Sequence, residues 1–533
     1  MASKSIQAGS PFDPSGPAVW GWCGLIVVAL VGVALRHHEF AAVHSWFDES
    51  LGWRMAQFPP GEIIDRSERN VHPPGHFLLL SAWRGLFGGS LSSLRYYSLL
   101  WGIGTVVGGY ALARAALSGR TAGRDQPERG ATDRGRSEFG GVLAALLIAL
   151  SPLHIHWSQQ VKMYALGTCL TVWSTWFLLR WFQSGGTYRL ACYVVLAAAL
   201  ALQHHYGTFT VFGQLTFALC WSGWRSWRGV REGDFLSILI TGWATASLWS
   251  LWLPSFLIQR ALVKRSYWIG EFSWQDVINV WGRLLVSHTS LPAADTTCLV
   301  IAELVLASVL MLLVHRGVGA RMVGWLVLVP YGVAAAWSVA DQNVMVPRYL
   351  INAHVCLLAG AAILIASIPV AAIRYLVAFV AIVGTGYLGY QQRLVRSSQA
   401  ALPGMSAAVE TLREVRAADE PVLVCNPMLY LNVCVHNEGL SDVYAFDPGH
   451  GFPHFQGAPV MRDDEYLSLS TVEEGGRDWV WTLDAEDWLG GNWKVRLPDA
   501  WHVQEEKRIR EWYGTLVIRA YRRNGSSPQE GDQ

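Results

Sequence analysis

Two adjacent carboxylates, Asp48 and Glu49, follow the first long apolar segment of the chain and stand beside Trp46 and Phe47. Acidic residues close to a membrane are costly unless they face a cavity or a partner, so they are candidates for function. A partly desolvated carboxylate is a stronger base, which could deprotonate an acceptor hydroxyl or amine. We therefore take Asp48 and Glu49 as candidate catalytic residues. The alternatives are a solvated loop, or a helix N-cap at Asp48.

A His-Pro-Pro sequence, His72-Pro73-Pro74, precedes a short apolar run at 75–87. Two prolines favour the end of one helix and the start of the next, and His72 could in addition bind a phosphate oxygen. The run would rise only about 20 Å as a helix, against a hydrocarbon core of about 30 Å. We predict that residues 37–92 form one loop on the outer face of a membrane, with a juxtamembrane or re-entrant helix at 75–87.

The composition is that of a membrane protein. Of the 533 residues, 52% are hydrophobic and 15% are charged, and 27 are Trp. Soluble domains carry about 25% charge, and Trp favours the membrane–water interface. Apolar segments recur from residue 18 to about residue 391, which predicts a polytopic α-helical membrane protein. The formal net charge of +1 gives no indication of nucleic-acid binding.

Basic loops predict the orientation, because short loops rich in Lys and Arg stay in the cytoplasm. The strongest such loop is 116–138, and 224–231 and 315–321 are others. If residues 75–87 do not cross the membrane, the chain has about eleven spans, a count that is uncertain by two. Every basic loop then lies on the cytoplasmic side. We expect residues 1–17 to be a cytoplasmic tail. The predicted spans are 18–36, 93–115, 139–155, 163–182, 190–206, 207–223, 235–257, 296–314, 322–340, 349–367 and 371–391.

After residue 391 the charge density rises and the apolar runs shorten to strand length. We predict an extracytoplasmic α/β domain over 392–523 and a disordered tail over 524–533. Its predicted elements are a helix at 405–417 and strands at 421–425, 478–483 and 515–521.

The cysteines and histidines show no CxxC or other metal-ligand spacing. Cys425 and Cys434, the two cysteines beyond the apolar segments, could form a disulfide if their domain is outside the cytoplasm. We expect no cofactor, although the carboxylates of Asp48 and Glu49 leave a divalent metal open.

Several stretches occur together: VHSWFDE from Val43, NVHPPGHFLLLSAW from Asn70 and ALSPLHIHWSQQVKMYAL from Ala149. With them, residues 18–190 resemble the polyprenyl-phosphate-dependent glycosyltransferases of family 39. This GT-C group includes protein O-mannosyltransferases and the bacterial aminoarabinose transferase of lipid A. The resemblance continues more weakly to about residue 391, where Pro347-Arg348-Tyr349-Leu350 is similar to the family's Arg-Tyr-Leu.

The resemblance implies an integral enzyme of the plasma (inner) membrane that takes a sugar from a polyprenyl-phosphate donor. The acceptor, which could be a lipid, a glycan or a protein, would be met on the outer face. The family's essential acidic pair corresponds to Asp48 and Glu49, with the base or acceptor-positioning role on Asp48. Arg95 matches an active-site Arg of the protein mannosyltransferases, and an Arg that anchors the helix at the interface is an equal alternative.

One departure from the family pattern affects the chemistry. The family's Ser-Gln-Glu-Ala-Arg-x-Tyr-Ala is replaced by a run in which Gln160 stands for Glu and Lys162 for Arg. Lys162 and Tyr164 can still contact a donor phosphate. The loss of an acid at Gln160 places more of the chemistry on Asp48 and Glu49, and less on any metal.

Cations would stabilise the phosphate that leaves the anomeric carbon. The outer-side candidates for contact with the donor are Lys162, Arg260, Lys264, Arg265 and Arg348, with Tyr349 beside Arg348. Three cations at 260–265 run against the positive-inside bias, although anchoring by Arg and Trp at the interface would also explain them. His204-His205-Tyr206 is a weaker candidate on the same side.

Two other functions fit the sequence. A lipid or sugar transporter would also place polar residues within a bundle, although no inverted repeat or pair of broken helices stands out. A non-catalytic protein of polysaccharide assembly would fit the loss of the acid at Gln160. Membrane lipids are expected partners in each case.

Overall fold

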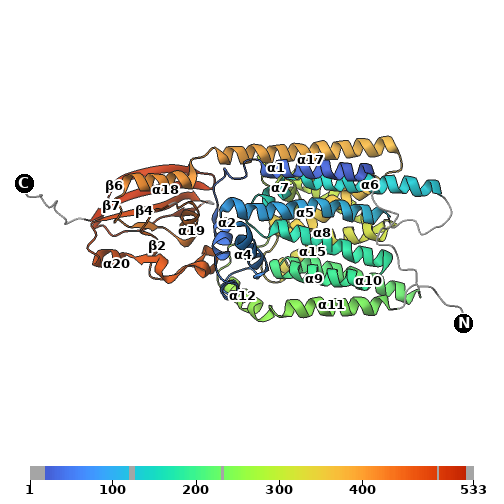
Figure 1. The fold of residues 1–533 in the computed structure, drawn as a ribbon, viewed down its shortest axis with the longest axis horizontal. Coiled ribbons are helices and arrows are strands. Elements are labelled where there is room, and N and C mark those ends of the chain that lie inside the picture. The colour runs from blue at the N-terminus through green and yellow to red at the C-terminus, as the bar shows by residue number, and fades with distance from the viewer. Residues whose placement is uncertain (1–18, 119–126, 230–232, 438, 489–490, 524–533) are drawn as a thin grey trace, which may run out of the picture.

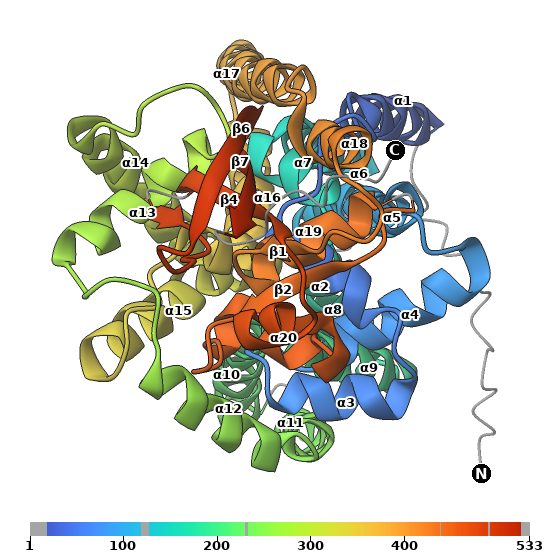
Figure 2. The same cartoon turned by 90° about the vertical axis from the view of Figure 1, so that its left-hand side faces the viewer.

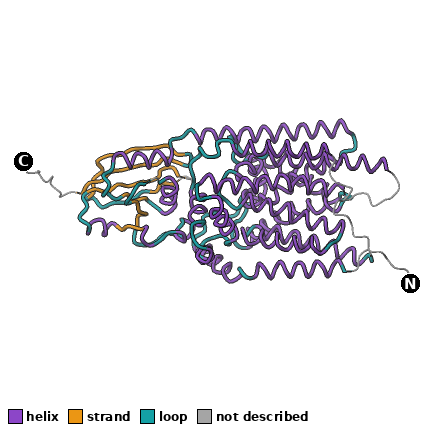
Figure 3. The backbone as a smooth tube through the Cα atoms, in the orientation of Figure 1, coloured by secondary structure: helices purple, strands orange, loops and turns teal. Residues whose placement is uncertain are grey.

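The computed structural model describes residues 19–118, 127–229, 233–437, 439–488 and 491–523. The predicted tails 1–17 and 524–533 lie outside these residues, as do Arg120 and Arg124 of the basic loop. Figure 1 shows an elongated molecule in which a bundle of long helices is joined end to end to a smaller domain. The strands are confined to this smaller, C-terminal domain (Figure 3).

Each predicted span corresponds to a long helix of the bundle. These helices are α1 (Val19–His37), α5 (Leu91–Ser118), α6 (Pro127–Leu150), α8 (Tyr164–Ser184), α9 (Thr187–Gln203), α10 (Gly207–Trp227), α11 (Asp234–Ser250), α14 (Asp295–Val314), α15 (Val318–Ala340), α16 (Ile351–Ser367) and α17 (Ala371–Ala400). By length and composition, 6 helices in the described residues could cross a membrane, or 8 if each of two bent pairs is one span. The chain is therefore an integral membrane protein, and about eleven crossings remain a prediction.

The apolar character of these helices is only partly related to their burial. Among the helices long and apolar enough to cross a membrane, α14 is the most apolar and exposes most of its surface, and α5 is the least apolar and is mostly buried, whereas α16 is both strongly apolar and the most buried. A helix surrounded by protein can carry small and polar residues, since its neighbours rather than lipid contact them. This explains why central helices such as α8 carry a weaker apolar signal.

Short helices lie between the bundle and the C-terminal domain. They are α2 (Phe47–Met55), α3 (Pro60–Glu68) and α4 (Gly75–Phe87), and α3 and α4 run across the end of the bundle (Figures 1 and 2). The helix α4 has the predicted bounds, and Pro74 occupies its N-cap. Its 13 residues end at Phe87 and are followed by Gly88, whose φ of 87° favours glycine. The predicted helix at 75–87 is confirmed, and its position beside the membrane stays a prediction.

Two helix breaks occur at the same end of the bundle. The helix α6 continues into α7 (Pro152–Ser158) through a bend of 64°, and α11 continues into α12 (Leu253–Arg265) through a bend of 60°. A proline lies in the first turn of both α7 and α12, where it fits because it has no N–H to leave unpaired. The remaining elements here are α13 (Trp274–Val286) and the 3-10 turn η1 (Pro347–Leu350).

The C-terminal domain is built on a mixed sheet of order β3-β2-β1-β4-β7-β6, with β5 paired to β4. The first four strands of this order are parallel, and β4, β7 and β6 are antiparallel. The strands are β1 (Val422–Val424), β2 (Val443–Asp447), β3 (Tyr466–Ser468), β4 (Trp479–Trp488), β5 (Gly491–Trp493), β6 (Trp501–Glu511) and β7 (Gly514–Arg523), with helices α18 (Gly404–Val415), α19 (Pro427–His436) and α20 (Leu469–Glu474).

The predicted helix and strands of this domain are α18, β1, β4 and β7, so its α/β class is confirmed. The edge strand β6 was not predicted, because Val503 and its polar neighbours face solvent and carry no apolar alternation. Cys425 and Cys434 are both free, so the disulfide that the sequence left open is absent.

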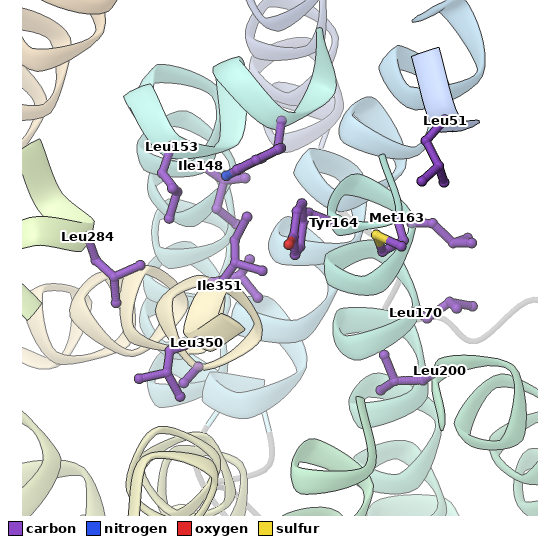
Figure 4. Close-up of a cluster of buried hydrophobic side chains, with 14 of the residues drawn as sticks. Leu51, Ile148, Leu153, Met163, Tyr164, Leu170, Leu200, Leu284, Leu350 and Ile351 are labelled. Carbon is purple, nitrogen blue, oxygen red and sulfur yellow. The ribbon is translucent and has the colours of Figure 1, made fainter. Parts of the chain in front are cut away.

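The apolar core is continuous from the bundle into the C-terminal domain. Figure 4 shows the part of it around Tyr164 of α8. Side chains of α2, α6, α7, α9, α13 and α16 surround this region, represented by Leu51, Ile148, Leu153, Leu200, Leu284 and Ile351. The start of α8 is thereby fixed against the segment that carries the acidic pair.

Candidate active site

Glu49 is held by a buried ion pair. Arg95 of α5 donates from Nη2 to Glu49 Oε2 at 2.7 Å and from Nε to Oε1 at 2.9 Å. The backbone N–H of Val161 donates to the same Oε1 at 3.0 Å, and both charged side chains are 0% exposed. Both oxygens of Glu49 are therefore bonded within the protein, and Arg95 is bound to Glu49 and to the carbonyls of Phe40 and Val43.

Asp48, the neighbouring acid, keeps access to solvent. Its side chain is 20% exposed, and its Oδ1 lies 3.2 Å from Nζ of Lys162, which is 4% exposed. Burial lowers the pKa of Lys162, and the negative charge of Asp48 opposes this change. Asp48 is in the first turn of α2, whose N-cap is Trp46, so the N-cap alternative is excluded. The helix dipole favours a carboxylate at this position.

Gln160, the residue that departs from the family pattern, has a structural contact. Its Oε1 accepts a hydrogen bond of 2.7 Å from Nε1 of Trp46, the residue that precedes α2. A neutral amide can accept here without placing a second negative charge beside Asp48. Gln160 therefore fixes the segment that carries Lys162 against the start of α2.

Arg348 is a cation near Asp48 that has no carboxylate bound to it in the described residues. Its guanidinium carbon lies 5.1 Å from the ring centre of Trp268 and 5.4 Å from that of Tyr349. Its Nε is buried without a hydrogen-bond partner among the described residues. Asp48 and Tyr164 lie within electrostatic range of it. Since buried N–H groups are nearly always paired, this donor is available to an acceptor group of a ligand or to a water.

A cavity of about 560 Å³ adjoins Tyr349 and is lined mainly by apolar side chains of α10, α11, α12 and α15. His72, His204 and Tyr206 also line it, and the rings of Tyr206 and Tyr349 stack at 4.1 Å. The rings of His72 and His204 lie 5.0 Å apart. Burial lowers the pKa of His72 well below its ordinary value, so at neutral pH His72 is a neutral hydrogen-bonding group rather than a cation.

The three cations at 260–265 do not act as one cluster. Arg260 and Lys264 both bind Asp341, at 3.0 Å and 2.8 Å. Arg260 lines the apolar cavity, whereas Arg265 lines a second, polar groove of about 930 Å³ between α3, α12 and the C-terminal domain. The cavity and the groove share Ser266 and His454, which are hydrogen-bonded at 3.1 Å. Asp341 offsets one of the three positive charges at 260–265.

Sequence reasoning missed Asp341 and His454. An acid directly after the apolar helix α15 was a usable signal, because charged residues at that depth need a partner. His454 lies in an irregular segment of the C-terminal domain, and nothing in the sequence places it beside α12. The described residues contain no group of three or more His, Cys, Asp or Glu arranged to hold a metal ion. A metal at the acidic pair would have to displace Arg95 from Glu49.

Comparison with known proteins gives no match to a family model and none to a curated sequence. Solved structures do match. ArnT from Cupriavidus metallidurans in the apo state has a TM-score of 0.57 at 12% identity, over 94% of this chain and 98% of that chain. The same protein bound to undecaprenyl phosphate has a TM-score of 0.54 at 13% identity, over 97% and 100%.

A weaker likeness, with a TM-score of 0.33 at 14% identity, is to the Saccharomyces cerevisiae protein O-mannosyltransferase Pmt1-Pmt2 complex bound to the sugar donor, over 52% of this chain and 38% of that chain. The likeness to ArnT, by contrast, extends over both the bundle and the C-terminal domain. The chain therefore has the membrane fold of ArnT, the GT-C fold that the sequence resemblance predicts.

Proposed function

We propose that the protein is a membrane glycosyltransferase that uses a polyprenyl-phosphate sugar donor. The observation that carries the proposal is the group formed by Asp48, Lys162 and Arg348: a solvent-accessible carboxylate faces a buried ammonium, with an incompletely bonded guanidinium close by. A structure of ArnT, which has the same fold, contains undecaprenyl phosphate. The combination of one base with two cations fits the transfer of a sugar from a lipid phosphate.

The chain's own residues have distinct roles in the proposed reaction. The acceptor O–H or N–H attacks the anomeric carbon while the bond from that carbon to the phosphate oxygen breaks. The acceptor proton goes to Asp48, and the bonding electron pair leaves with the phosphate. Lys162 and Arg348 stabilise the charge that develops on that phosphate. Tyr164, Tyr349 and neutral His72 supply hydrogen bonds that orient the donor.

The apolar cavity fits the isoprenoid part of such a donor. Its lining includes Phe209, Phe212, Leu215, Trp249 and Trp337, and also Tyr349, the residue that follows Arg348 in the chain. An isoprenoid chain placed there would bring its phosphate to Arg348, with the sugar toward Asp48. Arg260, Lys264 and Arg265 would then line the approach to the site and would not bind the phosphate directly.

The polar groove supports an approach for the acceptor from the side of the C-terminal domain. It opens between α3 and that domain, and it reaches the apolar cavity at Ser266 and His454. We place this end of the molecule, with the C-terminal domain, outside the cytoplasm, because the basic loops lie at the other ends of the helices. The sugar and the acceptor remain open.

The proposal is tested with the purified full chain in lipid nanodiscs. Polyprenyl-phosphate monosaccharides are supplied with membrane extract as acceptor, and the release of polyprenyl phosphate is measured by mass spectrometry. We expect turnover that falls at least about 100-fold in Asp48→Asn, the scale of a lost general base. Asp499→Asn, which changes an exposed acid of the C-terminal domain, should retain full activity.

Retained sugar transfer in folded Asp48→Asn would refute the role of Asp48. The absence of covalent turnover, with lipid moving between the leaflets of reconstituted vesicles, would favour a transporter instead. The observation that favours a transporter as the second candidate function is the apolar cavity joined to a polar groove.

A further inference from the structure

The helix α2, which carries Asp48 and Glu49, is held on one side by the bundle and on another by the C-terminal domain. On the bundle side it is fixed by Arg95 and the N–H of Val161, both bonded to Glu49. On the domain side the main contact is the helix α19. A helix of 9 residues is marginal by itself, so its orientation depends on these contacts.

Asn432 is the central domain-side contact. The hydroxyl of Ser50 donates to Asn432 Oδ1, and Asn432 Nδ2 donates to the hydroxyl of Tyr513 at 3.1 Å. Ser50 and Asn432 are both 0% exposed. Ser50 follows Glu49 directly, so the hydrogen-bonded line from Arg95 through α2 ends in the sheet domain at Tyr513. Asn432 lies in α19 and is not part of the sheet, so its contact with α2 is not a consequence of strand pairing.

Contacts at both ends of α2 reinforce this junction. Before the helix, Ser45 Oγ lies 3.1 Å from Nε2 of His436, at the end of α19. In its last turn, Arg54 forms an ion pair with Glu465 of the C-terminal domain. The helix α2 is therefore held at its beginning, its middle and its end by residues far away in the sequence.

The backbone of Gly457 packs closely against Phe47, the residue before Asp48. Gly457 of the C-terminal domain has a φ of 92°, and a Cβ at this position would lie 3.2 Å from the ring of Phe47 and 3.2 Å from Leu431. Glycine is required there by conformation, and it also leaves room for Phe47. The domain surface is thus shaped to fit the first turn of α2.

We infer that the C-terminal domain positions the catalytic helix, and that Asn432 is a positioning residue for Asp48. The inference rests on the proposed function. The domain then does more than cover the site, because it holds the helix that carries Asp48 in place. A displacement of about 1 Å in a catalytic group can cost about 100-fold in rate, so loosening of α2 should lower kcat more than donor binding.

The test is a double-mutant cycle in the full chain with Ser50→Ala, Asn432→Ala and the double variant. Each single variant should lower kcat about 10-fold or more, with the KM for the donor changed less than about 2-fold, and the double variant should lose no more than the worse single one. Asn437→Ala is the matched control, because the side chain of Asn437 bonds within its own domain, to Leu440, and to no residue of α2 in the part of the chain that the structure describes.

Hydrogen exchange supplies a second readout that does not depend on activity. Amides of α2 should exchange faster in Ser50→Ala and Asn432→Ala, while those of α4 and β6 keep the wild-type rate. Since Ser50→Ala removes a single hydroxyl, it remains informative if Asn432→Ala fails to fold. Unchanged kcat and unchanged exchange of α2 in Ser50→Ala would overturn the inference. Wild-type protein without transfer activity would instead refute the proposed function, and the exchange result would still test the positioning role.

Discussion

Exchanging Glu49 for Gln should destabilise the protein more than exchanging Asp48 for Asn, although the two acids are adjacent. Glu49 and Arg95 form a bidentate pair in which neither side chain is exposed. Breaking a buried pair typically costs 3–5 kcal/mol, because a buried charge is left unpaired. Gln keeps one oxygen that can accept from Arg95, so we expect a loss of about 3 kcal/mol.

Asp48 gives a different expectation because its side chain is 20% exposed. An Asn at this position still accepts a hydrogen bond from Lys162, so we expect a loss of about 1 kcal/mol. The melting temperature of the full chain, followed by Trp fluorescence in one detergent, measures both effects. Glu49→Gln should lower it by about 3–6 °C, and Asp48→Asn by about 1–2 °C.

Activity separates the two acids in the opposite direction. Asp48→Asn should lower turnover by at least about 100-fold while the fold is retained. Glu49→Gln should lose much less turnover at temperatures where it is folded. Arg95→Gln should destabilise the chain to a similar extent, and the double variant should be less destabilised than the sum of the single changes. A stable Glu49→Gln variant without activity would refute the structural role of Glu49 and would assign the chemistry to that residue.

Three further predictions concern other parts of the molecule. Arg348→Lys should weaken polyprenyl-phosphate binding about 10-fold or more in a fluorescence titration, because a point charge cannot replace a planar guanidinium; wild-type affinity would contradict this. Burial raises the pKa of Glu511 from 4.5 to about 7, so the folded state retains this proton more strongly and its contribution to stability falls, by about 3 kcal/mol, as pH rises from about 4.5 through 7; Glu511→Gln should flatten the stability profile between pH 5 and 8, and an unchanged profile would exclude this group. Gly102→Ala should cost about 1–3 kcal/mol, since its Cβ would lie 2.1 Å from Ser158 Oγ. Gly85→Ala in α4 meets nothing within 4 Å and should stabilise the protein by up to about 1 kcal/mol, because alanine favours a helix more than glycine does.

The long helices and α4 were predictable because their signals are local. The bounds of α4 follow from the length of one apolar run and from the proline pair before it. The placement of this run outside the membrane followed from the charges of later loops, which is a property of the whole chain. The short strands of the C-terminal domain were only partly predictable, because edge strands such as β6 carry charged residues along most of their length.

The distinct environments of the candidate site residues could not be predicted, because they depend on contacts distant in the sequence. Nothing near Glu49 in the sequence indicates that Arg95 binds it, so both acids were taken as candidate catalytic residues. Likewise, nothing in the sequence indicates that Arg260 and Lys264 share Asp341 as an ion-pair partner. The ion pair between Lys162 and Asp48 could not be predicted either, because the two residues are far apart in the sequence.

The central claim is that a lipid phosphate binds beside Asp48, and a cryo-electron microscopy map of the full chain with polyprenyl phosphate tests it most directly. We predict phosphate density in contact with Lys162 and Arg348, with the isoprenoid chain in the cavity lined by Tyr206 and Tyr349. Phosphate density at the opposite end of the bundle, near Arg134 and Arg136, would contradict both the site and the orientation of the protein in the membrane.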